Sequence, residues 1–255
     1  MKNLIHLFLL CLMMVATTAC AGTITDVGDK AYWGGNGHGH GDVIGGGMYD
    51  ISNAYVGVAG NTLTIRIATR FAGHAGADTW ATPNGIGYGD VFLASAWNPF
   101  GLDAHHSSDN AANGTRWSYG LNLDNRWNNN GGNFTLYELN GATNASNILN
   151  AQAFMSCALG TQCHYRDGQA TAVKTSSATV RNTGLSGKWT VERDSALLFS
   201  IDIGGTALLR YDEMALHWGE TCQNDVIEGM TDVPEPAGIA LFALGLLGVA
   251  LRRKG

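Results

Sequence analysis

The sequence has 255 residues, of which 45% are hydrophobic and only 14% charged, and 35 are glycine. Its 15 basic and 21 acidic residues give a formal net charge of −6, and four of the basic residues lie in the two terminal segments. The central region is therefore more acidic than the whole and repels phosphate backbones, which argues against a nucleic-acid partner. Its length suits one substantial core rather than two.

The first segment, residues 1–21, is predicted to be a secretory signal peptide. A short basic start precedes an apolar run over residues 4–16. Ala19 and Ala21 then form an A-x-A site for cleavage by signal peptidase. Two alternatives stay open at this end. Cys20 is also placed as a lipobox cysteine would be, and the apolar run could be a retained membrane helix.

Residues 22–232 are predicted to form one secreted domain built from short β-strands. Residues 62–70 alternate strictly, which places Leu63, Ile65 and Ile67 on one face. Further strands are expected at residues 50–58, 89–96, 115–123, 133–139, 170–180, 188–193, 196–203 and 207–218. Glycine- and asparagine-rich turns separate these runs. We expect a single antiparallel β-sandwich, jelly-roll or concanavalin-like, flanked by an N-terminal signal helix and a C-terminal short transmembrane helix. Residues 145–155 are the best helix candidate within the domain.

Three cysteines fall in this domain, and they suit an oxidising compartment. Cys157 and Cys163 are separated by a short glycine-containing loop, so we expect a disulfide between them. Cys222 is then either a free thiol or an alternative partner of one of them. A zinc site at these cysteines would need a ligand spacing that the sequence does not show.

Four acidic residues are candidate calcium ligands: Asp90, Glu213, Asp225 and Glu228. Asp90 follows a glycine-rich turn before a buried strand, so capping that turn is the alternative role. No other cofactor is expected.

The segment 214–229 is the most distinctive internal stretch. As a final strand it would place Leu216 and Trp218 on one side and His217 on the other, with Asn224 and Asp225 in the turn beyond.

The sequence contains neither GxSxG nor HExxH, and we predict that the protein is not an enzyme. A secreted hydrolase using Glu138, Glu192 or Glu213 is the catalytic alternative. Exposed aromatic rings would instead favour carbohydrate binding, because sugar faces stack on them. The candidates in loop-like segments are Trp80, Trp97, Trp117 and Trp127.

The C-terminal segment has three parts. Val233 precedes Pro234, Glu235 and Pro236, and the two prolines favour an extended, accessible backbone. Residues 237–251 carry no charge and would span about 22 Å as a helix, less than the roughly 30 Å of a bilayer core. The basic residues that follow would stay on the cytoplasmic side; they are Arg252, Arg253 and Lys254.

This order of parts resembles the PEP-CTERM sorting signal of Gram-negative bacteria over about the last 23 residues. The resemblance implies recognition by an exosortase, a membrane-embedded cysteine transpeptidase, and cleavage near the Pro-Glu-Pro. It further implies transient membrane association and delivery to the cell surface or to an exopolysaccharide matrix. An ordinary C-terminal anchor is the alternative. Residues 214–229 loosely resemble a pattern in the mature domains of many PEP-CTERM proteins, with no activity attached.

Together these observations predict an exported, exosortase-processed surface or matrix protein with a structural or adhesive role. A carbohydrate-binding, lectin-like module is the main alternative, and a secreted glycan hydrolase is a further one.

Overall fold

The computed structural model describes residues 21–26, 47–102, 106, 109–156, 165–166 and 168–233. Ten of its strands form one antiparallel sheet in the order β1-β2-β3-β10-β9-β6-β5-β4-β11-β12. The first six of these, as they lie in the sheet, are β1 Ala21–Thr25, β2 Ile51–Ala59, β3 Thr62–Thr69, β10 Ala196–Asp202, β9 Val180–Glu192 and β6 Gly131–Leu139. The remaining four are β5 Tyr119–Leu123, β4 Val91–Ala94, β11 Glu213–Gly219 and β12 Val226–Asp232.

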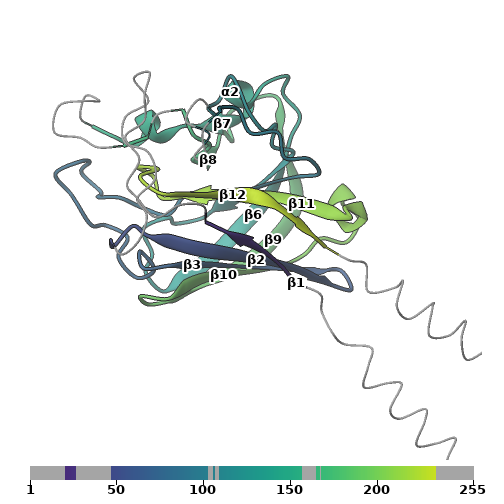
Figure 1. The fold of residues 1–255 in the computed structure, drawn as a ribbon, viewed down its shortest axis with the longest axis horizontal. Helices are drawn as coiled ribbons and strands as arrows, with labels where there is room; N and C mark the ends of the chain where they lie inside the picture. The colour runs from purple at the N-terminus through teal and green to yellow at the C-terminus, as the bar shows by residue number, and fades with distance from the viewer. Residues whose placement is uncertain are drawn as a thin grey trace, which may run out of the picture.

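The sheet curls until its two outer strands, β1 and β12, face each other, which makes it nearly barrel-shaped (Figure 1). Glycines allow this close approach. A Cβ atom at Gly22 would overlap the Thr231 hydroxyl, and one at Gly229 would lie 2.7 Å from Ile24 Cγ2. We call this meeting of β1 and β12 the seam. By bringing the two edges together, the fold leaves neither as an open template for another chain.

The expectation of an antiparallel all-β domain is confirmed, but its arrangement as a two-sheet sandwich is wrong. Neighbouring strands follow one another through a single continuous sheet. The strands that close it, β1 and β12, come from the two ends of the domain, and the sequence analysis assigned neither as a strand. Without β1 and β12 the remaining strands would form a sheet with two open edges.

The main core fills the inside of this barrel. Strand β3 shows why: Leu63, Ile65 and Ile67 alternate with exposed or half-buried residues and all three are buried, as the sequence predicts. Leu216 and Trp218 of β11 join the same core. Burial of each such side chain contributes about 1.5–3 kcal/mol.

A second, smaller cluster lies outside the barrel, on the opposite face of β4, β5 and β11. A short layer covers it (Figure 1), formed by α2 Asn144–Asn147, β7 Ile148–Leu149 and β8 Ala172–Val173. Ile148 and Val173 pack there against Phe92, Trp117 and Ala215. The predicted helix at residues 145–155 is therefore only partly right, because β7 interrupts it before the 3₁₀ turn η1 Ala151–Ala153. A second 3₁₀ turn, η2 Ala207–Arg210, precedes β11.

Several predicted features lie outside the described residues. These are the signal and C-terminal helices, the sorting residues Pro234, Glu235 and Pro236, the basic residues Arg252, Arg253 and Lys254, Ala19, and the cysteines Cys157 and Cys163. Within the residues that the structure does describe, no helix has the length and apolar character needed to cross a membrane.

Candidate functional site

His217 is the centre of a buried polar network outside the barrel. It lies on β11 between Leu216 and Trp218, and strand alternation turns it away from the main core as predicted. Its ring is fully buried and contacts the rings of Phe92 and Trp117. An ionisable ring in such surroundings needs hydrogen-bond partners, because burying an unpaired polar group is costly.

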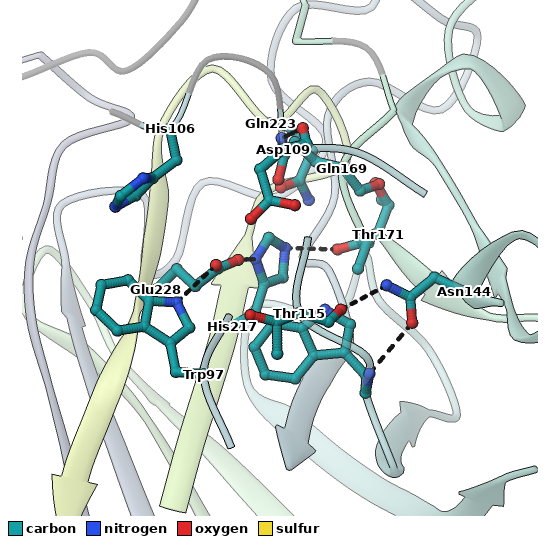
Figure 2. A network of polar contacts seen from close by, with 12 residues as sticks. Trp97, His106, Asp109, Thr115, Asn144, Gln169, Thr171, His217, Gln223 and Glu228 are labelled. Atoms are coloured by element: carbon teal, nitrogen blue, oxygen red, sulfur yellow. Dashed lines mark hydrogen bonds and ion pairs between the residues drawn. The ribbon is translucent and has the colours of Figure 1, made fainter. Parts of the chain in front are cut away.

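Both ring nitrogens of His217 have partners (Figure 2). Nε2 lies 2.8 Å from the backbone oxygen of Ala170, and Nδ1 lies 2.7 Å from Glu228 Oε2. A carbonyl oxygen only accepts, so Nε2 carries a proton. Glu228 is the cross-strand partner of His217 in the β11–β12 register. The pair thus joins two neighbouring strands and reaches to the segment before β8.

Glu228 is held in its ionised form. Burial opposes ionisation, but the hydrogen bond and positive charge of His217, with the contacts from Trp97 and Asp109, outweigh it and lower the pKa of Glu228. Trp97 donates its Nε1 hydrogen to Glu228 Oε1 at 2.8 Å. Both ring nitrogens of His217 therefore face oxygen atoms, and Nδ1 lies within ion-pair distance of the Glu228 carboxylate.

Asp109 completes the network from a loop, and its carboxyl group faces Glu228 and His217 (Figure 2). Burial, followed by the negative charge of Glu228, raises the pKa of Asp109 to about 9. Asp109 therefore keeps its proton at neutral pH. Two neighbouring buried carboxyl groups avoid repulsion when only one of them is ionised.

The loops around the network are tied down by their own hydrogen bonds. Asn144 accepts from the Trp117 backbone N–H at 3.1 Å and donates to the Thr115 carbonyl at 2.6 Å. Gln169 donates to the backbone oxygen of Asp109. These contacts join loops from distant parts of the sequence to one another around the network.

In this arrangement His217 and Glu228 bind segments of the chain together. The two nitrogens of His217 and both oxygens of Glu228 are already hydrogen-bonded, and His217 has no exposed surface. Sequence reasoning found His217 and Glu228 separately but missed their pairing and the part played by Asp109. The spacing of His217 and Glu228 about a turn is a signal that could have suggested a cross-strand pair.

The four calcium candidates do not come together. Glu213 is exposed at the start of β11, Glu228 pairs with His217, and Asp225 lies in the turn, where it accepts from the Ile51 N–H at 2.6 Å. Glu213 and Glu228 are also separated along the strand pair, because Glu213 stands opposite Asp232. Among the described residues no group of three or more His, Cys, Asp or Glu side chains could hold a metal ion.

Asp90 has a different role from either one considered in the sequence. It is fully buried and accepts hydrogen bonds from the backbone N–H groups of Leu123 at 3.0 Å and Val173 at 2.8 Å. Asn122 Nδ2 lies 2.8 Å from it, and Arg126 forms an ion pair at 3.2 Å. Asp90 thus joins the start of β4 to β5 and β8.

Of the four candidate sugar-stacking tryptophans, three are at least partly buried. Trp117 is in the outer cluster, Trp97 donates to Glu228, and Trp127 donates to the Gly85 carbonyl at 3.0 Å. Trp80 differs, because 61% of its surface is exposed.

Cys222 is a free thiol buried at the turn between β11 and β12. Burial raises the pKa of this thiol well above its usual value, which makes it unreactive. Within the described residues Cys222 has no disulfide partner, and the cysteines named as its alternative partners, Cys157 and Cys163, lie outside them.

The end of β12 belongs to the folded domain. Val233 is 3% exposed and belongs to the main core, and its N–H donates to the Asp212 carbonyl at 2.7 Å. Comparison with family models matches residues 232–254 to the PEP-CTERM protein-sorting motif. This chain carries a PEP-CTERM motif. The motif marks the protein for export across the membrane and implies an exosortase as its processing partner.

The match to the PEP-CTERM motif covers the C-terminal segment and leaves the β-domain to be interpreted from its structure. No curated protein matches the chain, and no solved structure matches it. The suspected sorting signal is thus confirmed, and the motif begins at Asp232, the last residue of β12.

Proposed function

We propose that the protein is a non-catalytic component of the cell surface or of an exopolysaccharide matrix, with a structural or adhesive role. The observation that carries this proposal is the PEP-CTERM motif at residues 232–254, which directs the domain to the surface. The network around His217 supports it, because its ionisable groups are used in holding loops to the barrel. In this proposal the signal peptidase removes residues 1–21 and an exosortase cleaves near Pro234 to Pro236.

Cell fractionation tests this function. In cells that contain an exosortase, the complete chain should accumulate in the surface and matrix fractions. A variant ending at Val233 keeps every described residue and should be lost from those fractions. Removing the gene should lower the mass of retained matrix, and the complete chain should restore it while the shortened variant should not. Equal matrix mass in all of these strains would contradict a structural role.

One observation favours a carbohydrate-binding module as the second candidate. The exposed indole of Trp80 is held in place, since its Nε1 donates to Asp78 Oδ1 at 2.9 Å. A fixed, exposed ring loses little entropy when a sugar stacks on it. A glycan array tests this role with the purified mature protein. Binding that disappears in Trp80→Ala but persists in Tyr55→Ala, another exposed aromatic residue, would establish it. No binding by the unaltered protein would exclude it.

A further inference from the structure

The PEP-CTERM motif overlaps the folded domain. Its first residue, Asp232, ends β12, and Val233 is buried in the main core with its backbone bonded to Asp212. A transpeptidase that reads residues before its cleavage site needs them extended and accessible, as proteases do. In the folded domain these two residues are paired and packed. Their recognition therefore requires the end of β12 to open.

At this point of the strand pair two acidic residues face each other. Glu213 stands directly opposite Asp232, and both side chains are exposed. The hydrogen bond from Val233 to Asp212 marks the adjoining residues as a hydrogen-bonded pair. Glu213 and Asp232 are then a non-hydrogen-bonded pair, in which side chains come closest. Like charges placed directly opposite each other destabilise an antiparallel pair.

The other side of β12 is held by packing against β1. Thr231 and Asp232 lie against Gly22, and Ile24 lies against Gly229. The neighbouring strands of the sheet are joined by ladders of hydrogen bonds, whereas the described residues of β1 and β12 form no such ladder with each other. On one side, the end of β12 thus packs against β1 without a ladder of hydrogen bonds. On the other side, Asp232 faces the like-charged Glu213.

We propose that the end of β12 is a release segment for the sorting enzyme: repulsion between Glu213 and Asp232 opens residues 231–233, and the exosortase binds the opened form. This inference rests on the proposed exosortase processing. It assigns Glu213, which lies outside the motif, as a positioning residue that controls access to it.

Glu213→Lys tests the inference without changing the motif, because it turns the repelling pair into an attracting one. When opening and closing are fast, cleavage follows the population of the open form. A change of roughly 1 kcal/mol in a cross-strand pair should slow C-terminal processing about fivefold in a pulse–chase experiment. Glu192→Lys is the control for charge, since it makes the same charge change at an exposed site on β9, where Glu192 pairs at 3.7 Å with Arg66 and is away from β12. It should be processed at the normal rate.

A spacer variant separates access from recognition. In this variant a flexible Gly-Ser segment that ends in a second Asp-Val is inserted between Val233 and Pro234. The folded domain then keeps its own Asp-Val, and the motif has the inserted copy. In this background Glu213→Lys should have no effect on processing. If Glu213→Lys is harmless in the natural chain, or slows the spacer variant equally, the release segment is disproved.

Hydrogen exchange of the purified protein gives an independent measurement. The amide of Val233 should exchange faster than that of Leu216 in the middle of β11, and Glu213→Lys should slow the exchange of Val233 about fivefold. If the natural protein shows this exchange pattern but is not processed in cells, the end of β12 does open, and the proposed exosortase processing is overturned. Exchange of Val233 as slow as that of Leu216 would overturn the opening itself.

Discussion

The strand pair β11–β12 carries two cross-strand pairs of ionisable residues on the same face, and they differ in every respect that matters. His217 and Glu228 attract each other and are largely buried, and each of them has a further hydrogen-bond partner of its own. Glu213 lies four residues before His217, and Asp232 lies four residues after Glu228; these two repel each other and are exposed. The comparison teaches that one pair of strands can carry a buried, attracting pair at its centre and an exposed, repelling pair at its end.

Burial explains why the two pairs have such different consequences. Around His217 the covering layer excludes water, so the ion pair is little screened, and removing one partner would leave a buried charge. Around Glu213 water screens the repulsion, which limits it to a small effect. The His217–Glu228 pair can therefore help to maintain the fold, while the Glu213–Asp232 pair has only a small effect on the end of the strand pair.

The largest expected effect comes from removing the buried attraction. His217→Ala leaves the Glu228 carboxylate without its counter-charge and should lower the free energy of unfolding by about 3–5 kcal/mol. Urea denaturation followed by tryptophan fluorescence measures this loss. His74→Ala is the matched control, because His74 pairs with Asp194 at 2.6 Å on the surface. If the two variants lose equal stability, burial does not distinguish the pairs.

A smaller loss is expected from overfilling the seam. Gly229→Val places a side chain against Ile24 and should lower the free energy of unfolding by about 1–3 kcal/mol. Combining it with Ile24→Ala makes room, so the double variant should lose less than the sum of the two single losses. Additive losses would show that β1 and β12 do not press on each other at this point.

The dependence of stability on pH is spread over several pH units, so the effect between neighbouring pH values is gradual. The pKa of Asp109 is raised from 3.8 to about 9 in the folded state. The folded protein therefore binds more protons than the unfolded chain between these values. This contribution to stability is complete below pH 3.8 and is lost progressively as the pH rises to about 9.

Asp109→Asn removes this titration. The free energy of unfolding of the variant, relative to that of the natural protein, should therefore rise as the pH increases from 5 to 9. Glu228 has the opposite sign, since its lowered pKa gives stability that is lost as the pH falls. Thermal unfolding at several pH values measures both trends. Glu192→Gln, which removes an exposed carboxyl group on β9, serves as the control. Parallel curves for Asp109→Asn and the natural protein would contradict the protonated state of Asp109.

The sequence predicted what depends on local pattern. Alternation in β3 and around His217 placed those side chains on the correct faces, and the order of parts at the C-terminus identified the PEP-CTERM motif. Closure of the sheet was missed because it depends on Gly22 and Gly229, whose small size matters only once β1 meets β12. Asp109 was missed because its raised pKa comes from burial beside Glu228, which is distant in the sequence.

The intact mass of the protein recovered from the surface of its own cells tests the account most directly. The account predicts a chain that begins at Gly22 and ends near Pro234 to Pro236, with Arg252, Arg253 and Lys254 absent. A surface protein that still carries these three basic residues would contradict exosortase processing.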